Sequence, residues 1–228
     1  MSYFIVEKKP KSPVSEAFRT LRTNLQFSSL DKEIQTIVVT SAGPSEGKST
    51  TIGNLALTLQ QSNKSVLLID CDLRKPSIHK KFKISNSVGM SNILIEDTNP
   101  EEIFHKYNDN LYILTAGTIP PNPAELLSTN KFRRFIENMK QKFDYILIDA
   151  PPVIAVTDAQ ILASFVDGVL LVVSSRQAER EQVKKAKELL EKVNANILGV
   201  VLNKVDLESN GKYSYYYYYG TEERRRKG

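Results

Sequence analysis

The feature that most constrains the fold is a strand–loop–helix pattern at residues 36–59, TIVVTSAGPSEGKSTTIGNLALTL. An apolar run is followed by a glycine-containing turn, and an amphipathic helix begins at Lys48. In such a loop the backbone N–H groups converge on phosphate oxygens, and the helix N-terminus adds partial positive charge. Gly47 permits close backbone approach, Lys48 can reach the β- and γ-phosphates, and the Ser49 hydroxyl can bind Mg²⁺. The pattern is a Walker A arrangement and predicts a nucleotide-binding α/β domain.

Short apolar runs recur along the chain, with helix-length amphipathic segments between them. The runs are rich in Val, Ile and Leu without polar alternation, which is typical of strands buried on both faces of a parallel sheet. Their alternation with helices predicts an α/β fold with a doubly wound, mostly parallel sheet that binds ligands at the C-terminal strand ends. We expect strands at 36–41, 65–70, 111–116, 145–150, 168–174 and 197–203, helices at 14–29, 48–62, 129–142 and 178–194, and a proline-rich loop before a short helical turn at 119–127.

A single domain is expected over residues 1–205, followed by a flexible tail over 206–228. The 228 residues suffice for one sizeable α/β domain and are few for two. The tail is polar, tyrosine-rich and then basic, and it has no core-forming periodicity. The formal charge is +5, of which residues 211–228 contribute +3. The basic character therefore belongs mainly to the tail, and we expect no nucleic-acid partner.

The composition and the N-terminus predict a cytoplasmic protein. No run approaches the roughly 18 apolar residues that a membrane span needs, and MSYFIVEKKPKSP lacks the apolar core of a secretory signal. The single cysteine, Cys71, cannot form an intramolecular disulfide, which fits a reducing compartment. We expect Cys71 to pack near a strand end rather than to act as a catalytic thiol.

Two further strands of the predicted sheet end in carboxylates. VLLIDCDLRKP brings Asp70 and Asp72 to a strand end, and both could face the phosphates because residues two apart project the same way. A helix N-cap or a solvated turn is the alternative interpretation of this pair. YILIDAPP resembles a Walker B strand and ends in Asp149, where an acidic residue usually holds Mg²⁺, often through water. With Lys48 and Ser49, these carboxylates predict a Mg·ATP site.

The last predicted strand continues into VVLNKVD, which places Asn203 at its end. An asparagine in this position often reads a nucleobase edge, so we expect its amide to contact adenine, with a structural turn as the alternative. The expected ATP contacts are then Gly43, Pro44, Ser45, Glu46, Gly47, Lys48, Ser49, Thr50 and Asn203.

Taken together, these motifs resemble those of the bacterial tyrosine kinases, a family tied to capsule and exopolysaccharide production. The resemblance covers nearly the whole chain and implies an ATP-dependent protein-tyrosine autokinase that uses ATP and Mg²⁺. It rests on SAGPSEGKST, LLIDCDLRKP (called Walker A′ in that family), ILIDAPP, the triplet Glu16, Arg19 and Arg22, and YSYYYYY at 213–219.

The resemblance also implies roles for individual residues. Asp70 would accept the phenolic hydrogen of an incoming tyrosine, which is chemically reasonable because a free phenol has a pKa of about 10 and needs activation. The phosphates and Mg²⁺ would be bound by Lys48, Ser49 and Thr50. The metal would be held by Ser49, Asp72 and Asp149.

Six of the ten tyrosines are clustered in the tail, at Tyr213, Tyr215, Tyr216, Tyr217, Tyr218 and Tyr219. Alone, such a cluster could be a β-prone or low-complexity end. Beside a nucleotide site and the family resemblance, we expect these tyrosines to be phosphoacceptors. The resemblance implies that a neighbouring subunit phosphorylates them in trans.

Glu16, Arg19 and Arg22 lie three residues apart on one face of the helix expected at 14–29. The simple interpretation is a solvated Glu–Arg pair within the helix. The family pattern instead assigns the triplet to subunit contacts in a ring-like homo-oligomer.

The resemblance further implies a separate transmembrane activator that recruits the chain to the inner face of the cell membrane. The basic stretch at 224–227 could approach anionic lipid or remain solvated. The main alternative function is a non-kinase P-loop ATPase switch of the partitioning and septum-placement class. Those ATPases carry an extra lysine early in the Walker A loop, where this chain has Ala42. A small-molecule kinase is a third possibility, but no dedicated substrate lid is evident.

Overall fold

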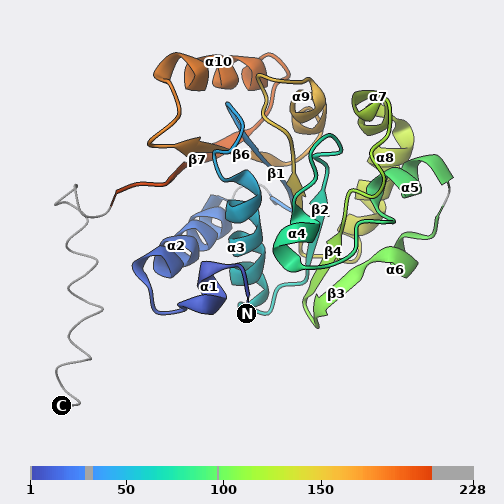
Figure 1. Cartoon of the computed structure of the whole chain (residues 1–228), viewed down its shortest axis with the longest axis horizontal. Coiled ribbons are helices and arrows are strands. Elements are labelled where there is room, and N and C mark those ends of the chain that lie inside the picture. The colour runs from blue at the N-terminus through green and yellow to red at the C-terminus, as the bar shows by residue number, and fades with distance from the viewer. Residues whose placement is uncertain (1, 29–32, 97, 207–228) are drawn as a thin grey trace.

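The computed structural model describes residues 2–28, 33–96 and 98–206. A seven-stranded sheet of order β3-β4-β2-β5-β1-β6-β7 forms its centre (Figure 1). Every neighbouring pair is parallel except β3 and β4. The expected doubly wound α/β fold is therefore confirmed. The strands are β1 (Thr36–Ser41), β2 (Val66–Asp70), β3 (His105–Asn108), β4 (Leu111–Leu114), β5 (Tyr145–Asp149), β6 (Gly168–Ser174) and β7 (Ile197–Asn203).

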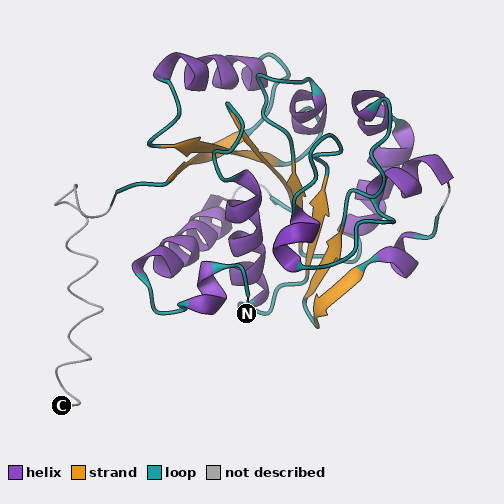
Figure 2. Ribbon diagram, in the orientation of Figure 1, coloured by secondary structure: helices purple, strands orange, loops and turns teal. Residues whose placement is uncertain are grey.

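Helices cover both faces of this sheet (Figure 2). Side chains of α1 to α4 join the strands in one core, and those of α5 and α7 to α10 join them in the other. The first group is α1 (Ile5–Lys8), α2 (Pro13–Ser28), α3 (Lys48–Gln60) and α4 (Ile78–Phe82). The remainder are α5 (Met90–Glu96), α6 (Pro100–Ile103), α7 (Pro123–Ser128), α8 (Asn130–Lys140), α9 (Asp158–Ala163) and α10 (Arg180–Glu191).

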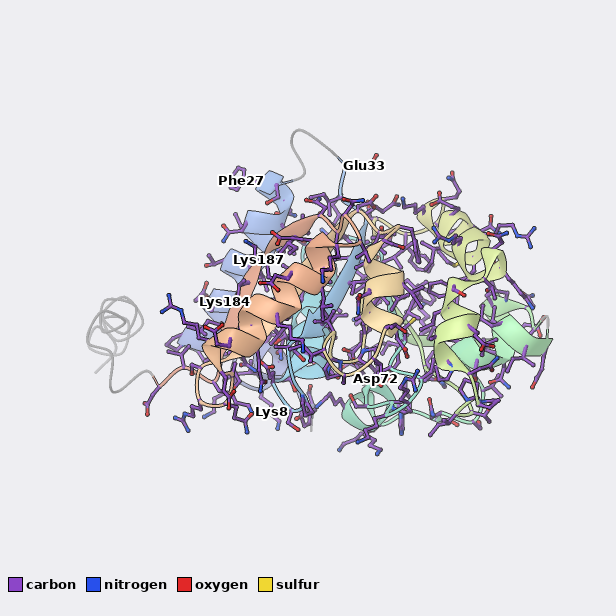
Figure 3. The ribbon with its side chains drawn as sticks, turned by 90° about the horizontal axis from the view of Figure 1, so that it is seen from above. Lys8, Phe27, Glu33, Asp72, Lys184 and Lys187 are labelled. Carbon is purple, nitrogen blue, oxygen red and sulfur yellow. The ribbon has the colours of Figure 1, made fainter. Side chains whose placement is uncertain are left out.

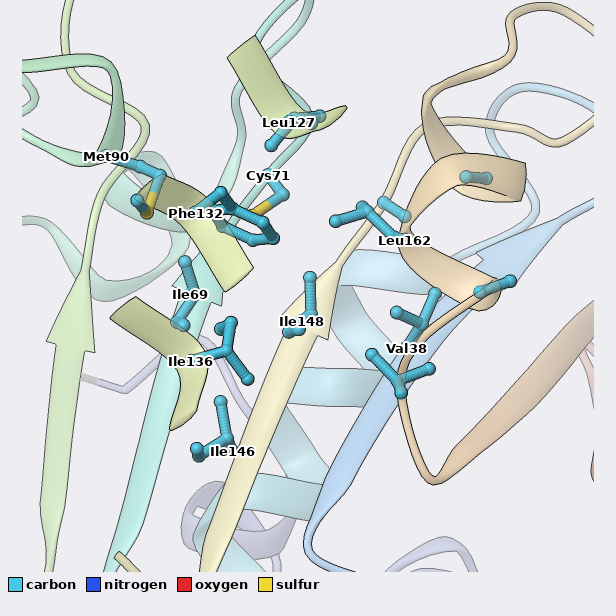
Figure 4. Packing of buried hydrophobic residues seen from close by; sticks show 14 of the residues in the cluster. Val38, Ile69, Cys71, Met90, Leu127, Phe132, Ile136, Ile146, Ile148 and Leu162 are labelled. Carbon is cyan, nitrogen blue, oxygen red and sulfur yellow. The ribbon is translucent and has the colours of Figure 1, made fainter. Parts of the chain in front are cut away.

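The central strands β1, β2, β5 and β6 are buried along their whole length. Their continuous Val, Ile and Leu runs supply apolar side chains to both cores, as parallel strands between two helical layers require. Cys71 lies in this packing with Phe132 and Leu127 nearby (Figure 4), and burial raises the pKa of its thiol. The expectation that Cys71 packs near a strand end is confirmed, and its lack of a catalytic role stays a prediction.

The prediction that 197–203 is buried on both faces is wrong. This segment forms β7, which pairs with β6 alone and ends the sheet. Val200 and Leu202 are 59% and 54% exposed. An apolar run indicates a strand, but the number of its neighbours depends on the order of strands in space.

One strand boundary and one additional strand at the other edge of the sheet also differ from the expectation. The strand expected at 111–116 ends at Leu114, because Thr115 and Ala116 turn away and accept hydrogen bonds from the N–H groups of Met90 and Ser91. The antiparallel edge strand β3 was not expected, since His105–Asn108 is polar and only half-buried. Both differences lie away from the phosphate-binding loop.

The N-terminal segment, residues 4–6, packs against α3. The sequence patterns did not indicate this contact. The Phe4 ring is buried against Gly53, where an added Cβ would lie 2.2 Å from a ring carbon. The N–H of Val6 donates to Asn54 Oδ1 at 3.2 Å. Glycine at position 53 is therefore needed for this close approach of residues 4–6 to the first turns of α3.

Residues 207–228 of the tail, including the tyrosine cluster at 213–219 and the basic stretch at 224–227, lie outside the described residues. Within the ranges that are described, no helix has the length and apolarity needed to cross a membrane.

Candidate nucleotide site

The loop at 42–47 joins the C-terminal end of β1 to the N-terminus of α3. Gly47 has a φ of 100°, in the left-handed region that favours glycine. A Cβ at this position would lie 2.1 Å from Asn203 Nδ2. Because Gly47 occupies the N-cap and has no side chain, it leaves the amide end of α3 open to an anion.

The buried side chain of Glu46 stabilises this loop through hydrogen bonds. Its carboxylate is buried and accepts hydrogen bonds from the N–H of Gly43 at 2.5 Å and of Ser174 at 2.8 Å. The predicted contact of Glu46 with ATP would therefore come from its backbone, because its side chain joins the loop to the end of β6.

Two hydrogen bonds from the end of β7 also stabilise this loop, and their donors are Asn203 and Lys204. Asn203 Nδ2 donates to the Glu46 carbonyl at 2.8 Å, and Lys204 Nζ donates to the Ser45 carbonyl at 2.8 Å. This geometry favours the structural alternative for Asn203, and its contact with adenine stays a prediction.

Asp149 is the buried acidic group of the site. It stands at the end of β5, beside β1 and β2, and is fully buried. Among the described residues, neither of its oxygens has a partner of standard hydrogen-bond geometry. Burial raises its pKa to about 6, while the charge of Lys48 and the nearby Ser49 hydroxyl act in the opposite direction.

Asp72 faces the same group of side chains. It is 9% exposed, and its Oδ1 accepts a hydrogen bond from the N–H of Lys75 at 3.0 Å. Burial raises its pKa, against the favourable charge of Lys48. The structure therefore brings Lys48, Ser49, Asp72 and Asp149 together. Asp72 lies at the end of the molecule opposite Glu33, which precedes β1 (Figure 3).

Asp70 is placed differently from its neighbours. It pairs in register with Asp149 across β2 and β5. Its Oδ2 accepts from the N–H groups of Ser77 and Ile78 at 2.9 and 3.0 Å, and its Oδ1 accepts from that of Asp72 at 3.2 Å. Burial and the nearby Asp149 raise its pKa well above the usual range. Its role as acceptor of a phenolic proton stays a prediction and would require one oxygen to become accessible.

The carboxylates fit a magnesium site completed by a nucleotide. Among the described residues, no three His, Cys, Asp or Glu side chains form a metal cluster by themselves. Mg²⁺ usually keeps several waters and binds one or two carboxylates together with substrate phosphates. The unpartnered buried oxygens of Asp149 beside Ser49 match this requirement.

An ion pair that sequence reasoning missed supports the Walker A′ segment. Arg74 donates to Asp158 through Nε and Nη2, both at 3.0 Å, and Asp158 is fully buried at the start of α9. A bidentate pair of this kind fixes geometry as well as charge. Asp158 belongs to no motif, and its position in the first turn of a helix gave no sign of this partner.

The triplet on α2 makes contacts within its own chain. Glu16 and Arg19 form an ion pair, and Arg19 Nη2 donates to the Pro10 carbonyl at 2.8 Å. Arg22 Nη1 donates to the Thr58 carbonyl of α3 at 3.0 Å. Glu16 remains largely exposed, so these contacts leave the interface role as a prediction.

A family model named ParA and described as NUBPL iron-transfer P-loop NTPase matches residues 33–227. The tyrosine-protein kinase YwqD of Bacillus subtilis (strain 168) is 44% identical over 212 residues, which cover 92% of this chain and 90% of that protein. The chain belongs to the bacterial tyrosine kinases.

Other bacterial tyrosine kinases are also similar to this chain in sequence and in structure. The putative tyrosine-protein kinase CapB of Staphylococcus aureus is 41% identical over 94% of this chain and 95% of its own length. The crystal structure of the chimerical protein CapA2B2 has a TM-score of 0.86 and 40% identity, covering 90% of this chain and 91% of that one. The protein is thus a protein-tyrosine kinase of the P-loop NTPase class. Members of that class generally bind nucleotides together with Mg²⁺. The predicted family and enzyme class are confirmed.

Proposed function

We propose that this bacterial tyrosine kinase transfers the γ-phosphoryl group of Mg·ATP to tyrosines in its own tail. The observation that carries the proposal is that Lys48, Ser49 and Asp149 lie close together beside the loop at 42–47. Catalysis of phosphoryl transfer depends mainly on positioning and on stabilising charge on the transferred group. Lys48 would hold the phosphates, and Ser49, Asp72 and Asp149 would hold Mg²⁺, which neutralises charge on the phosphates when bound.

The proposed acceptors are Tyr213, Tyr215, Tyr216, Tyr217, Tyr218 and Tyr219. We propose transfer in trans, to the tail of a neighbouring copy. In the cell, the activity would regulate synthesis or export of capsular or extracellular polysaccharide, which the names CapB and CpsD of similar proteins support.

A mixing experiment tests the acceptors and the transfer in trans. One protein carries Lys48→Met with an intact tail, and the other has a wild-type site with the six tail tyrosines changed to Phe. After incubation with Mg·ATP, mass spectrometry should find phosphate on the tail of the Lys48→Met protein only when both proteins are present. Each protein alone is the matched control.

The outcomes of this experiment separate the candidate functions. Tail phosphate on the wild-type chain that never appears on Lys48→Met in the mixture would refute transfer in trans. ATP hydrolysis by the wild-type chain without any phosphotyrosine would favour the non-kinase switch. The same incubation with the cytoplasmic part of a candidate activator tests whether a separate partner raises the rate.

The proposed assembly is a ring-like homo-oligomer in which α2 contributes to subunit contacts. The partner would be a transmembrane activator that brings a cytoplasmic kinase to the inner face of the membrane. The name CapA2B2, which joins an A and a B component, supports a separate partner.

Changing Glu16, Arg19 and Arg22 together to Ala is expected to reduce the assembly to smaller species in light scattering. The single change Arg22→Ala is the control for packing on α3, because Arg22 donates to the Thr58 carbonyl within its own chain. An unchanged assembly size for the triple variant would remove these residues from the interface.

A further inference from the structure

We propose that Tyr3 is a second phosphoacceptor of this kinase, modified at its hydroxyl oxygen beside the phosphate-binding helix. The inference rests on the proposed function, because the same nucleotide site must supply the phosphoryl group. It concerns a tyrosine at the opposite end of the chain from the tail cluster.

The placement of Tyr3 follows from how the N-terminal segment is attached. Phe4 is buried against Gly53, and Val6 bonds to Asn54, so the chain before them is held over the first turn of α3. The Tyr3 hydroxyl lies near the side chain of Thr50, which follows the predicted metal ligand Ser49. Tyr3 is nevertheless 47% exposed. A tyrosine with a partly exposed side chain therefore lies beside the helix that begins at the nucleotide site.

The surroundings of this hydroxyl suit a phosphate. Lys81 Nζ donates to Tyr3 Oη at 3.1 Å, and Lys8 Nζ lies 5.9 Å from the ring centroid. A phosphate on Oη could form charge-assisted hydrogen bonds with these ammonium groups. A cavity of about 210 Å³ adjoins the ring and offers room for the added group; it is lined by Ser2, Tyr3, Phe4, Lys81, Phe82, Lys83 and Tyr107.

Lys81 also links this cavity to the nucleotide site. Its helix, α4, begins at Ile78, whose N–H donates to Asp70 of the nucleotide site at 3.0 Å. The cation that bonds to the acceptor hydroxyl is therefore carried by a helix that is attached to that site. This proximity is the reason to place Tyr3 among the kinase's own substrates.

The other tyrosines in the described ranges lack this combination. Tyr107 lines the same cavity, but its hydroxyl donates to both oxygens of Glu7 at 2.9 Å, so a phosphate there would meet a carboxylate. Tyr145 is only 7% exposed, and the ring of Tyr112 packs against Phe143 in the core on the other face of the sheet. Tyr107 therefore provides a matched control, with similar exposure and the opposite neighbouring charge.

The transfer is an ordinary phosphoryl substitution. Tyr3 Oη forms a bond to the γ-phosphorus of ATP while the bond from that phosphorus to the β,γ-bridging oxygen breaks. ADP leaves with the electron pair of that bond. The phenolic proton passes to water at the exposed side of the ring.

The test maps phosphate on the full chain after incubation with Mg·ATP. We expect phosphate on Tyr3, at a level about tenfold or more above that on Tyr107, because opposite and like charges act on the two phosphates. Tyr3→Phe should remove the N-terminal phosphate, and Tyr107→Phe should leave it. Lys48→Met should carry no phosphate at either end of the chain.

Phosphorylation of the tail serves as the internal reference. A phosphorylated tail with an unmodified Tyr3, or equal phosphate on Tyr3 and Tyr107, would overturn this inference and leave the proposed function standing. Phosphate on Tyr3 that persists in Lys48→Met would also overturn it, since another kinase would be responsible. An unphosphorylated tail would instead count against the proposed function.

Discussion

Asparagine in place of Asp149 is expected to stabilise the nucleotide-free fold at pH 7.5 while removing most phosphoryl transfer. Burial raises the pKa of Asp149 from 3.8 to about 6, so ionising this carboxyl costs the folded state more than the unfolded chain. The difference corresponds to about 3 kcal/mol. The neutral amide avoids this cost but lacks the negative charge that attracts Mg²⁺, so activity should fall by about 10²- to 10³-fold.

The pH dependence of this effect has a definite sign. A carboxyl whose pKa is raised by folding contributes stability below its unfolded pKa, near 3.8, and that contribution is lost as the pH rises through about 6. Asp70, whose pKa is also raised, acts in the same direction. The advantage of Asp149→Asn should therefore be present at pH 7.5 and absent near pH 4.

Urea unfolding of both proteins without nucleotide, across this pH range, measures the free-energy difference directly. Asp109→Asn is the control, because Asp109 is 94% exposed and lies far from the site in sequence. An Asp149→Asn protein that is less stable than the wild type at pH 7.5 would contradict the argument. Full kinase activity in that variant would remove Asp149 from the metal site.

Alanine at position 47 is expected to weaken Mg·nucleotide binding by about 10²-fold, which is close to 3 kcal/mol. The left-handed φ of 100° is unfavourable for any residue with a Cβ. The added carbon would also lie 2.1 Å from Asn203 Nδ2, so the bond from Asn203 to the Glu46 carbonyl would have to break. Both effects displace the loop that receives the phosphates.

Titration with a fluorescent nucleotide measures this loss. Gly199→Ala on β7 is the matched control, because an added Cβ there meets nothing within 4 Å and its φ is not positive. That variant should bind nucleotide as the wild type does. An affinity of Gly47→Ala within about threefold of the wild type would show that the loop adapts and that the strain argument is wrong.

The sequence was sufficient for the parts of the molecule that depend on local pattern. The runs at 36–41, 168–174 and 197–203 have the same bounds as β1, β6 and β7. The spacing of apolar residues that distinguishes a helix from a strand repeats within a few residues, so it can be recognised in the sequence alone. The sequence also predicted that Gly47, Lys48 and Ser49 lie where a loop passes into a helix, as they do at the start of α3. Their contacts with phosphate stay a prediction.

Other features depend on which segments meet, and no local pattern carries that information. The apolar run of β7 predicted a strand buried on both faces, but the strand order put it at an edge with Val200 and Leu202 exposed. The N-terminal tyrosine was not singled out, because its relation to Thr50 depends on Phe4 packing against Gly53 some 50 residues away.

The acidic residues of the site show most clearly what the sequence determines and what only the tertiary structure determines. The sequence by itself determined that Asp70, Asp72 and Asp149 end two strands beside a phosphate-binding loop. The tertiary structure decided their differences: Asp70 accepts backbone hydrogen bonds from the start of α4, while Asp149 is buried with both oxygens unpartnered. The physical reason is that a motif specifies which groups are present, whereas burial and hydrogen-bond partners depend on the neighbours that folding brings to each group.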